Sequence, residues 1–176
     1  MTTKFKFNFS LWIGVCTGIY AVIYSFSPLG QTGIMPISFV AFAIFFASGA
    51  NREEFINFAL CFSCGVGWAK ICIFTLGLTA SLPMPEVYSS ALTFVVFITM
   101  VTFVHFIIPE KFRLNKTPGC FGGILSTLLL GGDMAIPVLS NLIAGLIFAY
   151  VCASGALFLT PKGDWTLPSN VKTDQG

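Results

Sequence analysis

Charge is what this sequence of 176 residues lacks most. Asp, Glu, Lys and Arg make up 9% of it, whereas a soluble domain carries about 25% charged residues. Such a chain cannot cover a globular surface with charge, and it has no soluble domain for binding nucleic acid. The hydrophobic content of 56% and the mean hydropathy of +0.88 agree. We therefore predict an all-α polytopic membrane protein whose main partner is the lipid bilayer.

Catalytic signatures are missing as well. The sequence contains no H-E-x-x-H, no G-x-S-x-G and no phosphate-binding loop with its lysine, and no apolar run carries paired carboxylates. A single histidine, His105, cannot provide bis-histidine ligation of a haem. We expect neither an enzyme nor a protein that needs a cofactor or a metal. His105 itself is interpreted as an interfacial residue, with a proton relay as the alternative.

The six cysteines all lie within apolar runs. Cys61 and Cys64 have the C-x-x-C spacing of metal and redox sites, but no second pair or histidine follows at zinc spacing. We interpret both as small apolar side chains of a membrane helix.

Apolar runs bounded by charges or by Pro and Gly turns predict six membrane-spanning helices. They cover about residues 9–26, 34–50, 55–80, 87–108, 118–132 and 135–160. Residues 1–160 then form one domain, and the polar tail 161–176 is expected to be poorly ordered. The fifth run has 15 residues, where a spanning helix needs roughly 20. We expect it to be a short packed helix, with a helix broken in mid-membrane as the alternative.

The basic residues predict the orientation. With six spans, the two termini and the second and fourth loops share one side. Eight of the nine Lys and Arg residues lie there: Lys4, Lys6, Arg52, Lys111, Arg113, Lys116, Lys162 and Lys172. The other three loops hold none, so both termini are predicted to be cytoplasmic.

The two halves of the chain, about 9–80 and 87–160, resemble each other. Residues 38–51 align with 120–133 at an offset of 82, and residues 61–69 align with 141–149 at an offset of 80. Small residues recur every four positions in both halves and predict close helix packing. The main packing candidates are Gly65, Gly123, Gly131 and Gly145. Since each half has three spans, the second half must be inverted relative to the first, as in many transporters.

The second half also resembles a known family. The order P-G-x-F-x-G at 118–123, then G-D at 132–133, G-L-I-F-x-Y at 145–150 and S-G at 154–155 is similar to the small bacterial inner-membrane proteins called domain of unknown function 1097. The resemblance covers about residues 10–160 and implies topology, since the family has no settled activity. Lys70 departs from its pattern. The six-span plan is also similar to that of urea and amide channels, which are homo-oligomers with a pore in each protomer.

Polar and aromatic residues at spanning depth are the candidate pore or solute-binding residues. They are Asn57, Trp68, Lys70, Ser126, Thr127, Asn141 and Phe148, with Phe45 as a possible part of a hydrophobic constriction. Lys70 either faces a wet path that attracts an anionic or carbonyl-bearing solute, or reaches the outer interface or a nearby acid. The polar side chains either line a pore or bond between helices, and the rings either gate it or pack in the core.

Two functions follow as hypotheses. The first is a channel or facilitator for a small polar solute: a urea-like or amide-like molecule, a short carboxylate or a small amine. The second is a non-conducting membrane protein that assembles or regulates another complex.

Overall fold

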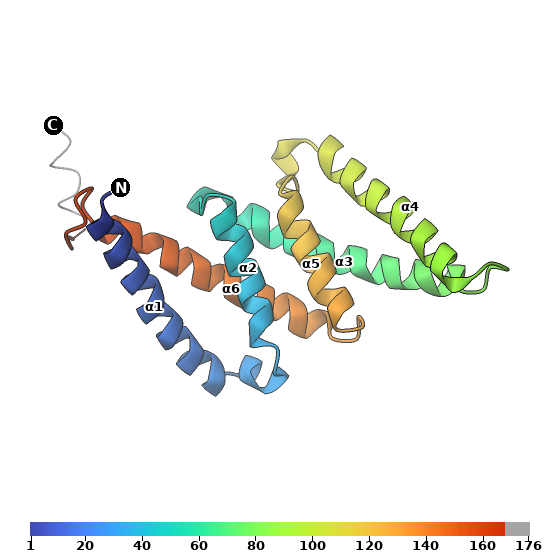
Figure 1. Cartoon of the computed structure of the whole chain (residues 1–176), viewed down its shortest axis with the longest axis horizontal. Coiled ribbons are helices and arrows are strands. Elements are labelled where there is room, and N and C mark those ends of the chain that lie inside the picture. The colour runs from blue at the N-terminus through green and yellow to red at the C-terminus, as the bar shows by residue number, and fades with distance from the viewer. Residues whose placement is uncertain (168–176) are drawn as a thin grey trace.

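The computed structural model describes residues 1–167, which form six α-helices joined by short turns (Figure 1). The helices are α1 (Thr3–Phe26), α2 (Met35–Ala47), α3 (Phe55–Thr79), α4 (Glu86–Ile107), α5 (Thr117–Leu129) and α6 (Ala135–Ser154). Short 3-10 helices lie at η1 (Pro28–Thr32), η2 (Arg52–Glu54), η3 (Glu110–Phe112) and η4 (Gly155–Phe158). The all-α prediction is confirmed, and each predicted span corresponds to one helix.

The six helices fall into two length classes. Helices α1, α3, α4 and α6 are long and apolar enough to cross a membrane. Helices α2 and α5 have 13 residues each, or about 20 Å at 1.5 Å per residue, whereas the hydrocarbon core is about 30 Å thick. Helix α5 is continuous, so it has the short packed form expected for 118–132. Both short helices carry a proline in the first turn, where no N–H is needed.

The short helices lie in the middle of the molecule, and α1 and α4 lie at its two ends (Figure 1). Helix α5 packs along α3 and α2 packs along α6, and these are the two most extensive helix contacts of the described chain. Both pairs run parallel. Gly119 at the start of α5 lies on Phe58 and Cys61, and Gly132 beyond its end lies on Ile73. In the other pair, Ser38 lies on Gly145, and Phe42, one turn later, lies on Phe148. The apolar core is built around these two pairs.

Two glycines make both contacts possible. A Cβ atom added at Gly65 of α3 would overlap the carbonyl oxygen of Cys120 in α5, and one added at Gly145 of α6 would overlap that of Ser38 in α2. Gly123 packs in the same way, because its added Cβ would overlap the carbonyl oxygen of Phe62. Backbone-to-backbone contact of this kind needs glycine.

Gly131 differs from the predicted role in helix packing. A Cβ atom added there would have nothing within 4 Å, and its φ is +68°. Gly131 and Gly132 form a left-handed turn that ends α5, and their N–H groups bond to the carbonyls of Leu128 and Thr127. A glycine is therefore required at position 131 by the left-handed backbone conformation and not by a close neighbour.

The first part of the tail packs against the start of α1. Asn8 Nδ2 donates to the Gly163 carbonyl at 2.8 Å, and Lys4 forms an ion pair with Asp164. The expectation of a poorly ordered tail is therefore wrong for 161–167, because the polar backbone there finds partners on α1. The rest of the predicted tail, 168–176, lies outside the described residues.

The glycine contact gives a first prediction. Gly65→Ala places a methyl group on the Cys120 carbonyl, so the free energy of unfolding should fall by about 1–3 kcal/mol. Gly67→Ala is the matched control, because its added Cβ meets nothing within 4 Å on the same helix. Thermal unfolding in detergent would measure both variants. Equal midpoints for the two would contradict the close contact between α3 and α5.

A second prediction concerns Ala50, which follows α2 with a φ of +52°. The left-handed conformation costs a non-glycine residue roughly 1–2 kcal/mol, so Ala50→Gly should raise the unfolding midpoint. Ala43→Gly, at an exposed position inside α2, should instead cost about 1 kcal/mol. The same unfolding assay separates the two substitutions, and destabilisation by both would refute the strain at Ala50.

Candidate functional site

A polar cavity of about 350 Å³ opens where α3 and α5 begin. Its lining residues are Glu53, Glu54, Asn57, Glu110, Arg113, Asn115 and Lys116. Lys116 Nζ lies 3.1 Å from Glu54 Oε1. Asn57 Nδ2 donates to Glu54 Oε2 at 2.9 Å and to Asn115 Oδ1 at 2.7 Å. The side chain of Asn57 therefore ties the start of α3 to the segment that leads into α5.

Polar contacts continue from this cavity into the helix bundle. Cys61 lies one turn beyond Asn57 on α3, and its thiol contacts Asn57 Oδ1 at 3.6 Å and the Arg113 carbonyl at 3.9 Å. The next carbonyl along the chain, that of Leu114, contacts His105 Nδ1 at 2.6 Å. The segment that lines the cavity is thus also in contact with His105, the single histidine of the sequence.

His105 is the centre of a buried cluster that we call the thiol–imidazole cluster. Its side chain is 1% exposed. Its Nε2 lies 3.1 Å from Cys120 Sγ, 3.7 Å from Cys64 Sγ and 3.3 Å from Trp68 Nε1. Helices α3, α4 and α5 each contribute to this cluster. The interpretation of His105 as an interfacial residue is therefore wrong, because α4 turns the ring into the bundle.

The hydrogen-bond partners fix the tautomer of His105. A carbonyl oxygen only accepts, so Nδ1 carries the proton that is donated to Leu114, and Nε2 keeps its lone pair in the neutral ring. Trp68 Nε1–H points to that lone pair. Across residues 1–167, no group of three His, Cys, Asp or Glu side chains has the arrangement that a metal ion needs.

The predicted site residues are distributed over several places. Asn57 lines the polar cavity and Trp68 belongs to the thiol–imidazole cluster. Ser126 and Thr127 are buried on α5, and Thr127 bonds to the Gly123 carbonyl of its own helix at 2.8 Å. Phe45 is fully buried and packs edge-on against Phe58, with ring centroids 5.6 Å apart.

Asn141 lies in a second polar group, between α1 and α6. It is fully buried, accepts from Tyr24 OH at 2.6 Å and donates to the Pro137 carbonyl at 2.9 Å. Tyr24 OH also lies 3.3 Å from Thr32 Oγ1. This group holds the C-terminal part of α1 against α6.

Lys70 is exposed on α3. Its Nζ lies 4.0 Å from the position of a Cβ atom added at Gly132, in the turn after α5. The two ion pairs found within the described chain join Lys4 to Asp164 and Lys116 to Glu54, so neither involves Lys70. The amine thus lies beside the carbonyl end of α5, where the helix dipole favours a cation.

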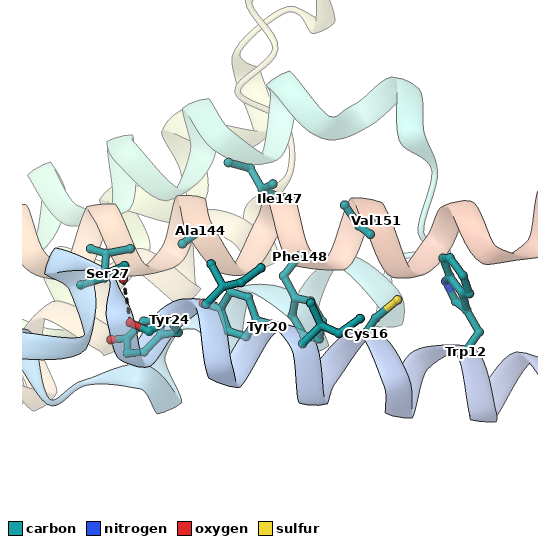
Figure 2. A pocket seen from close by; sticks show the side chains of 12 residues that line it. Trp12, Cys16, Tyr20, Tyr24, Ser27, Ala144, Ile147, Phe148 and Val151 are labelled. Atoms are coloured by element: carbon teal, nitrogen blue, oxygen red, sulfur yellow. Dashed lines mark hydrogen bonds between the residues drawn. The ribbon is translucent and has the colours of Figure 1, made fainter.

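Phe148 faces an apolar groove between α1 and α6, shown in Figure 2. Its ring stacks on Tyr20 at 4.5 Å and on Phe42 at 5.0 Å. The groove has a volume of about 520 Å³. Trp68 instead packs against Phe97 of α4. Trp68 and Phe148 therefore pack against different helices, as core rings do.

The polar group around Asn141 generates a prediction. In a double-mutant cycle of Tyr24→Phe and Asn141→Leu, the coupling free energy should be about 0.6 kcal/mol, and no more than about 1.7, the range measured between membrane helices. The unfolding midpoints of the four proteins give this value. The control is the cycle of Tyr24→Phe with Asn57→Leu. The effects of these two substitutions on the free energy of unfolding should add, because Asn57 bonds to other partners. A coupling of zero for the first pair would refute the bond.

Comparison with known proteins finds a family and no individual relative. No curated protein and no solved structure matches the chain significantly. The model of one family, described as a protein of unknown function (DUF1097), matches residues 10–157. This confirms the resemblance seen in the glycine and aromatic motifs of the sequence, and the chain therefore belongs to the DUF1097 family.

Proposed function

We propose that this protein is a channel or facilitator for a small polar solute in the bacterial inner membrane. It works as a homo-oligomer with a path through each protomer. The observation that carries the proposal is the matching pattern of helix ends and glycine contacts in the two halves of the chain, which supports an inverted repeat, the common architecture of transporters.

The ends of the short helices support the repeat. Helix α2 covers 35–47 and α5 covers 117–129, so both bounds differ by 82. The two left-handed residues after α2, Gly49 and Ala50, correspond to Gly131 and Gly132 after α5. The backbone hydrogen bonds of the two turns also correspond. After α2, the N–H groups of residues 49 and 50 donate to the carbonyls of residues 46 and 45. After α5, the N–H groups of residues 131 and 132 donate to the carbonyls of residues 128 and 127.

The glycine contacts support it independently. Gly65 and Gly145 differ by 80, and their partners Ser38 and Cys120 differ by 82, as in the sequence alignment. In the proposed repeat, the contact between α3 and α5 therefore corresponds to the contact between α6 and α2. Three helices in each half require the halves to be inverted relative to each other.

The contacts of the loops support an orientation with both termini in the cytoplasm. The start of α1 contacts 162–164, Lys116 pairs with Glu54, and Arg52 Nη2 donates to Tyr150 OH at 2.6 Å near the end of α6. Within residues 1–167, the segments that hold basic loop residues thus lie at one end of the bundle. That end is cytoplasmic by the positive-inside rule.

The polar cavity is the proposed cytoplasmic entrance. Three carboxylates, two cations and two amides line it, so its wall offers both donors and acceptors. Charges of both signs favour a neutral polar solute, such as a urea-like or amide-like molecule, over a single ion. Short carboxylates and small amines remain in the substrate class under test.

Stopped-flow measurements on proteoliposomes test the proposal. We expect faster permeation than in empty liposomes for at least one of urea, acetamide, glycerol, acetate, formate and methylamine. Asn57→Leu should reduce that rate several-fold by removing the amide at the cavity floor. Ser63→Ala, at an exposed position on the same helix, should leave it unchanged. Lys70→Met then reports whether the lysine selects for charge.

A folded protein with the permeability of empty liposomes for every solute would overturn the proposal. Purification with a heterologous protein in fixed stoichiometry would then favour the second hypothesis, a non-conducting assembly or regulatory partner.

A further inference from the structure

In the proposed repeat, the bundle of α3, α4 and α5 corresponds to the bundle of α6, α1 and α2, where the thiol–imidazole cluster has no counterpart. In the proposed repeat, Cys64 corresponds to Ala144 and Cys120 corresponds to Ser38. The α2–α6 contact is nevertheless as close as the α3–α5 contact. Helix packing of this kind therefore does not need sulfur at either position.

The cluster also has more hydrogen-bond donors than acceptors. His105 Nε2 offers one lone pair, because Nδ1 is committed to the Leu114 carbonyl. Three donors approach that lone pair: the thiols of Cys120 and Cys64 and the indole N–H of Trp68. Only one of these hydrogens can be donated to it at a time, and the other two are left to weaker acceptors such as sulfur. The ring nitrogen is therefore placed to receive a proton from either thiol.

We propose that Cys64 and Cys120 form a peroxide-reactive dithiol, with His105 as its base and a disulfide between α3 and α5 as its product. Both sulfurs contact the same ring nitrogen, at 3.7 and 3.1 Å. The backbones of the two helices touch at Gly65 and Cys120, beside both sulfurs. The chemical class of the oxidant is a hydroperoxide, and hydrogen peroxide is the simplest member.

The reaction proceeds in two steps. His105 Nε2 takes the proton of the Cys120 thiol, and the thiolate attacks one peroxide oxygen. The S–O bond forms, the O–O bond breaks, and the leaving hydroxide takes the proton from Nε2 and departs as water. Cys64 then attacks the sulfenic sulfur of Cys120. The S–S bond forms, the S–O bond breaks, and a second water leaves with the Cys64 proton. Two thiols are oxidised and one peroxide is reduced.

The cluster lies next to the polar cavity, which is the side from which we expect a small uncharged oxidant to approach. Arg113 and Asn115 line the polar cavity and flank Leu114, whose carbonyl holds His105. Cys61 joins the cavity floor to the same turn of α3. Cys64, His105 and Cys120 line none of the cavities found in the described chain, so hydrogen peroxide from the polar cavity has to pass the turn at Leu114 to reach them.

Thiol mapping of the full-length protein tests the proposal. The protein in detergent is treated with hydrogen peroxide, alkylated with a maleimide, digested and analysed by mass spectrometry. We expect the peptides of Cys64 and Cys120 to be joined and dithiothreitol to release them. Alkylation of both cysteines after treatment of the folded wild-type protein would overturn the proposal.

Variants assign the roles within the pair. Cys64→Ser should prevent the cross-link and leave a Cys120 sulfenic acid that dimedone traps, whereas Cys72→Ser on the same helix should behave as wild type. His105→Gln should slow cross-linking by about 10²-fold, a usual contribution of a general base, without preventing it. An unchanged rate in His105→Gln would overturn the role of His105.

Discussion

Backbone contact at two glycines determines how this fold is assembled. Water drives no association between apolar helices inside a bilayer, so close packing and hydrogen bonds must hold them together. Gly65 brings α3 onto the backbone of α5, and Gly145 brings α6 onto that of α2. The remaining helices depend on these pairs, because α1 is attached mainly through α6 and α4 mainly through α3. A larger side chain at either glycine would therefore separate the surfaces on which the other helices rest.

The length of α2 and α5 follows from the same packing. A helix of 13 residues cannot present its ends to water on both sides of a membrane about 30 Å thick. Its terminal backbone groups must find partners within the protein. The two left-handed turns provide them, since each bonds two carbonyls of the last helical turn. Glycine occupies three of the four left-handed positions, and Ala50 is the exception.

Sequence reasoning predicted the helices and their approximate ends well. Charges and Pro–Gly turns mark those ends, and small residues every four positions mark the faces that touch. The sequence did not reveal which side chains meet inside the bundle. Cys64, His105 and Cys120 lie on three helices, and only the rotation of each helix about its axis brings them together. The same limit applies to Asn57 and Asn141, which were predicted in one polar set but bond in separate groups.

The bundle of α1, α2 and α6 and the bundle of α3, α4 and α5 each have a close glycine contact but differ in their polar groups. The first bundle places Tyr24 and Asn141 together with Thr32 of η1, and this group satisfies its own hydrogen bonds. The second bundle places two thiols and an indole around one imidazole nitrogen, which can accept only one of their hydrogens. Since equal packing is reached with either set, packing cannot be the reason for the difference. The asymmetry therefore points to the bundle of α3, α4 and α5, next to the polar cavity, as the place of the proposed thiol chemistry.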